Sequence, residues 1–292
     1  MTTVGSGKYT YELIQDWPKL PQGEALGTVS TVATDSQDRV YAFQRQDPPV
    51  MVFDRAGNYL NCWGIGAIKD PHGMTIVDDL VYITDRSDHV AVKFTLDGKP
   101  LQVIGERGVF SDTGCEKPGD LVPRAAGPFN YCTEMTPSPS GDIYISDGYR
   151  NARVHRFDSS GRLINSWGQP GKAGPGEFHL VHSLLVDPEG RVYVCDRANR
   201  RVQIFSAEGE FITMWTGMGG PDNIVRDKDG IFYIAEQADE SGDSHVSIWD
   251  GDGNVLERWA IRHAHGLEVD SHGDIYLGLT IEQSVDKYVR LR

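Results

Sequence analysis

Three histidines stand at matching places in a repeated stretch of this 292-residue sequence. His72, His182 and His265 each precede the tyrosine of a recurring hydrophobic–Tyr–hydrophobic segment by ten or eleven residues. The segment occurs six times, and the histidines belong to the second, fourth and sixth copies. Three imidazoles that converge from directions about 120° apart suit a metal ion with three histidine ligands and one open position, the usual form of a catalytic zinc site. The alternative is three channel histidines that bind only water.

Arginines recur at a second matching place. Arg45, Arg86 and Arg197 each lie four residues after the same tyrosine, and Tyr149 lies one residue beyond this place in the third copy. The chain has 28 Lys and Arg against 42 Asp and Glu, a net charge of −14. In so acidic a chain, guanidinium groups gathered around the histidines predict a small ligand with a carboxylate, which Arg binds through two parallel hydrogen bonds. The alternative for each arginine is an ion pair with a neighbouring acid.

The elements that must position these side chains are short strands. The recurring segments are SQDRVYAF, VDDLVYIT, PSGDIYIS, PEGRVYVC, KDGIFYIA and SHGDIYLG, with their tyrosines at Tyr41, Tyr82, Tyr144, Tyr193, Tyr233 and Tyr276. Each of the first five is followed by a second strand-like run and then by a third, which usually ends on tryptophan. Strands joined by Asp/Gly turns at a period of about 40 to 50 residues predict an all-β fold, a six-bladed β-propeller with about four strands per blade.

The two ends of the chain are predicted to meet in one blade. The last repeat is one strand short, and the N-terminal segment YTYELIQDW is a spare strand that we expect to complete the sixth blade and close the ring. Closure leaves no open sheet edge between the first and last blades. Residues 1–292 are therefore predicted to form a single domain. The excess residues between the second and third copies, 106–130, are predicted to form an irregular lid loop.

Composition argues against several classes of protein. A charge of −14 repels nucleic acid and anionic membranes. No run of about 18 apolar residues is present, and the N-terminal residues lack the basic start and apolar stretch of a signal peptide. We expect a cytoplasmic protein, and a monomer because the predicted ring is closed and acidic. The cysteines at positions 62, 115, 132 and 195 show no CxxC spacing, which favours free thiols over a bridge between Cys115 and Cys132.

Three segments resemble a known family. ISDGYRNARVHRF, FHLVHSLLVDPEGRVYVCDRANRRVQIF and DPHGMTIVDDLVYITD are similar to the propeller of the peptidyl-α-hydroxyglycine α-amidating lyases (peptidylamidoglycolate lyases), within the wider NHL-repeat class. The resemblance covers most of the chain and is strongest over residues 131–207. In that family a zinc ion bound by three histidines lies in the channel, and the reaction splits an N-acyl-α-hydroxyglycine into an amide and glyoxylate.

The resemblance implies a role for each candidate residue. It implies a zinc site at His72, His182 and His265, a catalytic tyrosine at Tyr149 and substrate-binding arginines at Arg45 and Arg197. Gly266 stands where the family has a calcium-binding aspartate, which argues against structural Ca2+. Arg86 replaces an apolar residue of the family and His263 replaces a methionine, and we expect both to contact the substrate.

The sequence thus predicts a zinc-dependent lyase. It would cleave the carbon–nitrogen bond of an N-acyl-α-hydroxyglycine-like or other α-hydroxy amino or amido acid, releasing an amide or amine and an α-oxo acid such as glyoxylate. The predicted substrate is a small anionic cytosolic metabolite. Two alternatives stay open: a metal-dependent hydrolase or hydratase on the same propeller, since one architecture hosts several chemistries, and a non-catalytic NHL interaction propeller.

Overall fold

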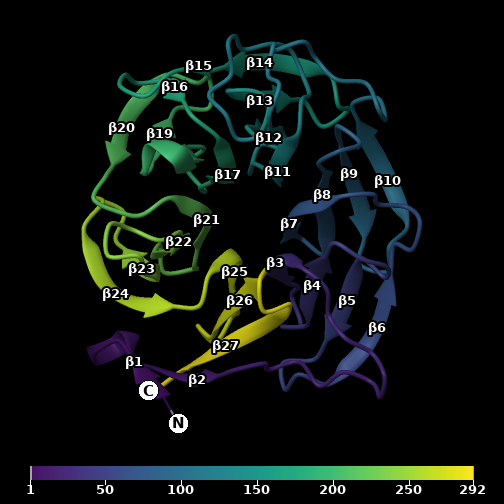
Figure 1. Cartoon of the computed structure of the whole chain (residues 1–292), viewed down its shortest axis with the longest axis vertical. Helices are drawn as coiled ribbons and strands as arrows, with labels where there is room; N and C mark the ends of the chain where they lie inside the picture. Colours follow the sequence, from purple (N-terminus) through teal and green to yellow (C-terminus); the bar gives the residue numbers. More distant parts are fainter. Residues whose placement is uncertain (1, 292) are drawn as a thin grey trace. The chain divides into compact units, whose positions relative to one another are not determined.

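Each of the six repeats folds as one antiparallel sheet with its own strands in chain order, and the sixth sheet also contains two strands from the N-terminus. The computed structural model describes residues 2–291 and is built from strands and two short 3-10 turns, η1 (Gly7–Tyr9) and η2 (Arg197–Asn199). The sheets are the blades of a six-bladed β-propeller, so the predicted fold is confirmed (Figure 1). Within the described residues, no helix is long and apolar enough to cross a membrane.

The strands of the first three blades have the following bounds. Blade 1 contains β3 (Val29–Thr34), β4 (Val40–Gln44), β5 (Val50–Phe53) and β6 (Tyr59–Trp63). Blade 2 contains β7 (Pro71–Val77), β8 (Leu80–Asp85), β9 (Val90–Thr95) and β10 (Pro100–Ile104). Blade 3 contains β11 (Cys132–Pro137), β12 (Ile143–Asp147), β13 (Arg153–Phe157) and β14 (Leu163–Trp167).

The remaining blades follow the same order. Blade 4 contains β17 (Val181–Val186), β18 (Val192–Asp196), β19 (Arg201–Phe205) and β20 (Phe211–Trp215), preceded by the short parallel pair β15 (Gln169–Pro170) and β16 (Glu177–Phe178). Blade 5 contains β21 (Pro221–Arg226), β22 (Phe232–Glu236), β23 (Ser244–Trp249) and β24 (Val255–Ile261). Blade 6 contains β25 (Ala264–Val269), β26 (Ile275–Leu279), β27 (Ser284–Arg290), β2 (Tyr11–Ile14) and β1 (Thr2–Val4).

The chain divides into two compact units. His72–Pro221, here called the central unit, holds blades 2, 3 and 4, and the described residues before and after it, here called the terminal unit, hold blades 1, 5 and 6. The single domain over residues 1–292 stays a prediction.

An aspartate organises the turn between the first two strands in four of the blades. In blade 4, Asp187 Oδ1 accepts the backbone N–H groups of Glu189 and Arg191, and Asp187 Oδ2 accepts the Tyr193 hydroxyl at 3.2 Å. The same tyrosine-to-aspartate bond occurs in blades 1, 5 and 6. This buried contact explains why tyrosine recurs in the repeat, because its ring fills the core and its hydroxyl needs a partner there.

The N-terminal strand completes the last blade. β2 pairs antiparallel with β27, from Tyr11 opposite Arg290 to Ile14 opposite Lys287, so the N-terminal strand completes the sixth blade as predicted (Figure 1). Tyr11 is fully buried, and its ring centroid lies 5.3 Å from that of Trp259. β1 pairs outside β2 as a further strand that the sequence analysis did not foresee.

Replacing Tyr11 by alanine should destabilise the fold by about 3–5 kcal/mol, since a large aromatic side chain would leave a cavity in a packed core. Thr3→Ala on the exposed strand β1 is the matched control and should change the free energy of unfolding by about 0.5 kcal/mol or less. Urea unfolding measures both. Equal unfolding midpoints for the two variants would show that β2 is not part of the closing blade.

Candidate functional site

Six equivalent positions lie ten or eleven residues before the recurring tyrosines. Each is the second residue of a blade's first strand, and all are buried: Ser30, His72, Thr133, His182, Asp222 and His265. In blades 1, 3, 4 and 6 the register with the second strand shifts across this residue. A β-bulge leaves its extra residue outside the ladder and turns that side chain in a new direction. The shifted position holds a polar side chain in each of these four blades, and histidine occupies the equivalent position in alternate blades.

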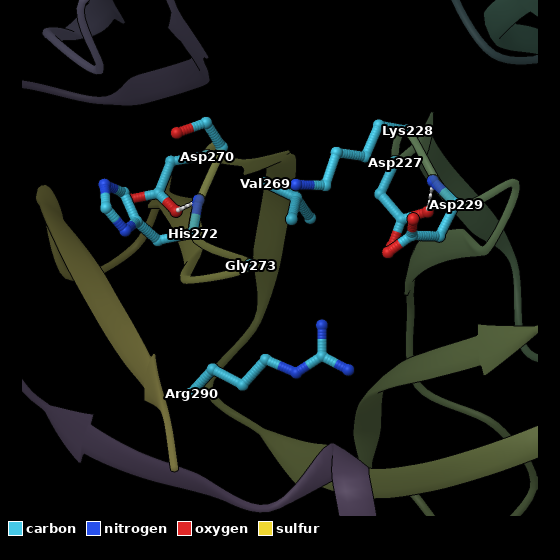
Figure 2. Close-up of a pocket in the computed structure, with 9 residues that line it drawn as sticks. Asp227, Lys228, Asp229, Val269, Asp270, His272, Gly273 and Arg290 are labelled. Atoms are coloured by element: carbon cyan, nitrogen blue, oxygen red, sulfur yellow. Dashed lines mark hydrogen bonds between the residues drawn. The ribbon is translucent and has the colours of Figure 1, made fainter. Parts of the chain in front are cut away.

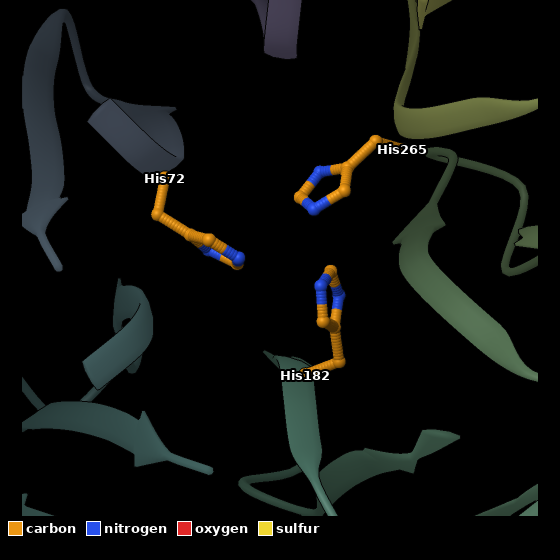
Figure 3. A group of neighbouring side chains, drawn as sticks. All are labelled: His72, His182 and His265. Atoms are coloured by element: carbon orange, nitrogen blue, oxygen red, sulfur yellow. The ribbon is translucent and has the colours of Figure 1, made fainter. Parts of the chain in front are cut away.

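His72 and His182 meet within the central unit. Their ring centroids are 4.8 Å apart, with the planes inclined by 65° (Figure 3). His72 Nδ1 lies 2.7 Å from the carbonyl oxygen of Thr133. Because a carbonyl only accepts hydrogen bonds, Nδ1 must carry the proton in the neutral ring, and Nε2 then carries the lone pair. This is the tautomer that a metal ligand needs.

His265 is held in the same way within the terminal unit. Its Nδ1 lies 2.7 Å from the carbonyl oxygen of Ser30, so its Nε2 also carries the lone pair in the neutral ring. Ser30 and Thr133 occupy the same repeat position, each in the blade that follows the histidine. Nitrogen ligands of this kind suit zinc and other borderline divalent metals. The chemistry of the three histidines therefore fits the predicted cofactor.

Tyr149 lies beside this histidine pair in the central unit. Its hydroxyl is 3.1 Å from His182 Nε2, and its ring centroid is 5.2 Å from that of His72. The guanidinium carbons of Arg86 and Arg197 lie 4.8 and 5.3 Å from the centroid of the same ring, and Arg197 Nη1 donates to the hydroxyl at 3.5 Å. The structure thus brings together five of the predicted site residues: a phenol, two imidazoles and two guanidinium groups.

Gly148 explains why the tyrosine comes one residue later than the arginines. Arg45, Arg86 and Arg197 directly follow the second strands of their blades, and Gly148 occupies this place in blade 3. A Cβ atom on Gly148 would lie 1.9 Å from the carbonyl oxygen of Val181 and 2.4 Å from its nitrogen. No side chain fits between the Tyr149 loop (residues 148–152) and β17, the strand that carries His182.

Arg45 and His263 belong to the terminal unit. Arg45 Nε donates to the Pro71 carbonyl at 3.2 Å and lies 3.9 Å from the Asp70 carboxylate. His263 Nδ1 is 3.5 Å from the Ser244 hydroxyl. The substrate-binding roles of both residues stay predictions.

Buried aspartates at the ends of the second strands of blades 3 and 4 stabilise the fold through hydrogen bonds and ion pairs. Asp147 accepts the backbone N–H of Asn130 at 2.9 Å. Asp196 accepts the backbone N–H of His179 at 2.8 Å and pairs with Arg201 at 2.8 Å. These bonds hold the segments that lead into the first strands of blades 3 and 4. The cysteines of the described chain, at positions 62, 115, 132 and 195, are thiols that form no disulfide, as predicted.

Two hollows lie away from these residues. One, of about 520 Å³, is formed by turns of blades 5 and 6, and Figure 2 shows the Lys228 and Arg290 side chains pointing into it. The other, of about 590 Å³, lies at the far ends of the first strands of blades 2 to 4, beside Tyr82 and Lys93. None of the predicted site residues lines either hollow.

Known proteins resemble this chain over most of its length. A family model described as a 6-bladed beta-propeller matches residues 138–216. Human NHL repeat-containing protein 3 is 31% identical over 97% of this chain and 85% of its own length. A probable peptidyl-alpha-hydroxyglycine alpha-amidating lyase of Caenorhabditis elegans is 28% identical over 86% of this chain and 79% of its own length. A streptogramin B lyase structure matches 97% of this chain and 99% of its own with a TM-score of 0.68, but at 11% identity the likeness concerns the fold alone.

The fold and these relatives define a β-propeller of the NHL-repeat class. Within it, the chain belongs to the family of NHL repeat-containing protein 3, and amidating lyases are among its more distant relatives. The predicted resemblance to the amidating lyases is thereby confirmed.

Gly148→Ala should cost about 1–3 kcal/mol of stability, because the added methyl group meets backbone atoms of Val181 that cannot move aside cheaply. Gly127→Ala is the matched control, since a Cβ there meets nothing within 4 Å, and it should be nearly neutral. Denaturant unfolding compares the two. A stable Gly148→Ala variant would mean that the Tyr149 loop does not press against β17.

Proposed function

We propose that this protein is a zinc-dependent carbon–nitrogen lyase, in which His72, His182 and His265 together hold the metal. The observation that carries the proposal is the Tyr149 hydroxyl, 3.1 Å from a histidine nitrogen and flanked by two guanidinium groups. An interaction surface has no need for a phenol in such a place. The amidating lyases among the relatives supply the reaction class.

Each side chain has a defined task in this reaction. Bound zinc would act as a Lewis acid that lowers the pKa of the substrate hydroxyl. Arg45 and Arg197 bind the substrate carboxylate and so orient the scissile bond. Tyr149, as its phenolate, takes the hydroxyl proton as general base. A carbon–oxygen double bond then forms, the carbon–nitrogen bond breaks with its electron pair on nitrogen, and the Tyr149 hydroxyl returns the proton to this nitrogen. The amide leaves and the α-oxo acid remains.

The proposed substrate is a small anionic metabolite, an N-acyl-α-hydroxyglycine or a related α-hydroxy amino or amido acid. Arg86, against the same tyrosine ring as Arg197, contributes a second positive charge to the binding region. His263 is proposed to contact the substrate from the terminal unit. We further propose that the protein acts as a monomer in the cytoplasm and needs no structural calcium.

A non-catalytic interaction propeller is the second candidate. The similarity to NHL repeat-containing protein 3 favours it, because that relative is 31% identical over nearly the whole chain and its name records no reaction. Metal content separates the two functions, since an interaction propeller has no need for zinc in its channel.

Protein purified without a histidine tag should contain about one zinc ion per chain by elemental mass spectrometry. The His72→Ala, His182→Ala double variant should lose it, because a single imidazole cannot retain the ion. His179→Ala is the control and should keep its zinc, since the His179 ring faces the Gly119 carbonyl instead. Wild-type protein that stays free of metal after incubation with zinc would contradict the lyase and favour the interaction propeller.

Tyr149→Phe keeps the ring that packs against the arginines and removes the proton acceptor. Glyoxylate release from an N-acyl-α-hydroxyglycine should fall by about 10²- to 10⁴-fold, with zinc retained. Tyr131→Phe removes a hydroxyl from the neighbouring ring against Arg86 and should leave turnover unchanged. Normal turnover by Tyr149→Phe would transfer the general-base role to water or His263.

A further inference from the structure

The long insertion of residues 106–130 is tied to the loop that carries Tyr149. The Gly119 backbone N–H donates to the Tyr149 carbonyl at 2.7 Å, and the Thr113 hydroxyl donates to the Arg150 carbonyl at 2.6 Å. The Asn151 side chain accepts the Ala126 backbone N–H at 3.1 Å. Three successive residues of the Tyr149 loop are therefore held by the insertion. It contains no strand of its own, so these contacts replace a sheet as its support.

Arg150 makes the central side-chain contact between the two segments. Its Nη2 donates to the carbonyl oxygens of Cys115 and Glu116, at 2.6 and 3.1 Å. Bonds from a charged donor are stronger than neutral ones. Arg150 and Tyr149 are adjacent, and one side chain reaches into the insertion while the other reaches His182. A shift of the Arg150 backbone would therefore move Tyr149 as well.

The Arg150 guanidinium also supports a row of stacked side chains. It lies 5.5 Å from the centroid of the Tyr131 ring, and the Arg86 guanidinium lies 5.8 Å from that centroid. Arg86 in turn lies against Tyr149. Tyr131 has a φ of +65°, a left-handed conformation that a bulky residue adopts only when its surroundings enforce it. Arg150 is thus linked to Tyr149 through the backbone and through this row.

We propose that Arg150 is a positioning residue, which clasps the insertion to the Tyr149 loop and so holds the Tyr149 hydroxyl beside His182. The inference rests on the proposed function, because it assigns Arg150 a task only if Tyr149 takes part in the reaction. The insertion has a second anchor, since Val122 and Cys115 are buried in the core cluster that contains Tyr144 and Phe178. Removing the Arg150 guanidinium should therefore loosen the insertion without unfolding the protein.

The rate of Cys115 labelling measures whether Arg150 holds the insertion, independently of activity. The residue is 9% exposed, and its thiol donates to the Lys117 carbonyl within the insertion. In Arg150→Met, thiol reagent should label Cys115 about tenfold faster than in the wild type, because two charged hydrogen bonds no longer oppose local opening. Labelling is followed by peptide mass spectrometry under native conditions. The fully buried Cys132 and Cys195 should stay unlabelled, which excludes global unfolding.

The kinetic experiment tests positioning itself. Arg150→Met should lower kcat for glyoxylate release about tenfold, with little change in KM and in zinc content, because the carboxylate-binding arginines stay in place. Arg150→Lys keeps one charged donor. It should recover part of the lost kcat and part of the protection of Cys115 from labelling. Arg162→Met removes an exposed arginine from a turn of the same blade and should change neither readout.

The outcomes separate this inference from the lyase proposal. An unchanged labelling rate for Cys115 in Arg150→Met contradicts the clasp whatever the activity. Faster labelling with an unchanged kcat overturns the positioning role and leaves the lyase intact. Wild-type protein that releases no glyoxylate contradicts the lyase and, with it, any positioning of Tyr149 for catalysis, while the labelling rate still decides whether Arg150 holds the insertion.

Discussion

The bond from an inner-strand histidine to the carbonyl of the following blade connects the candidate site to the packing of the propeller. His72 makes it to Thr133 in the central unit, and His265 makes it to Ser30 in the terminal unit. Each contact joins two neighbouring blades and gives the buried imidazole Nδ1–H a hydrogen-bond acceptor. It also leaves the lone pair on Nε2. A ligand-ready imidazole therefore follows from the way the first strands pack, and the geometry of the proposed metal centre depends on intact blades.

Two sets of charged groups near the candidate site have different roles: one stabilises the fold and the other packs against Tyr149. Asp196 is occupied by Arg201 and by the backbone of His179, so this buried acid stabilises the entry to blade 4. Arg86 and Arg197 instead lie against the Tyr149 ring. Guanidinium groups stack well on aromatic rings, and the Tyr149 ring contacts both cations. Positive charge can thus gather locally in a protein whose net charge is −14.

Membership of the NHL-repeat class leaves the activity open, because this architecture serves both enzymes and interaction proteins. The function must be argued from the side chains that the blades carry. The central unit alone assembles two imidazoles, the phenol and two guanidinium groups, with the insertion packed against the loop of the phenol. The proposed lyase accounts for this whole set, including the close fit at Gly148 that leaves the tyrosine one residue beyond the arginines.

The sequence by itself determined the blade count, the closing strand and the places of the candidate histidines and arginines, because a repeat assigns every residue a position relative to its tyrosine. It did not reveal β1, the tautomers of His72 and His265, or the role of Arg150. Those depend on contacts that no repeat period encodes, such as the bond between Thr113 and Arg150 across an insertion that occurs once. Only the tertiary structure decided them, since the partners are distant in sequence and meet through packing.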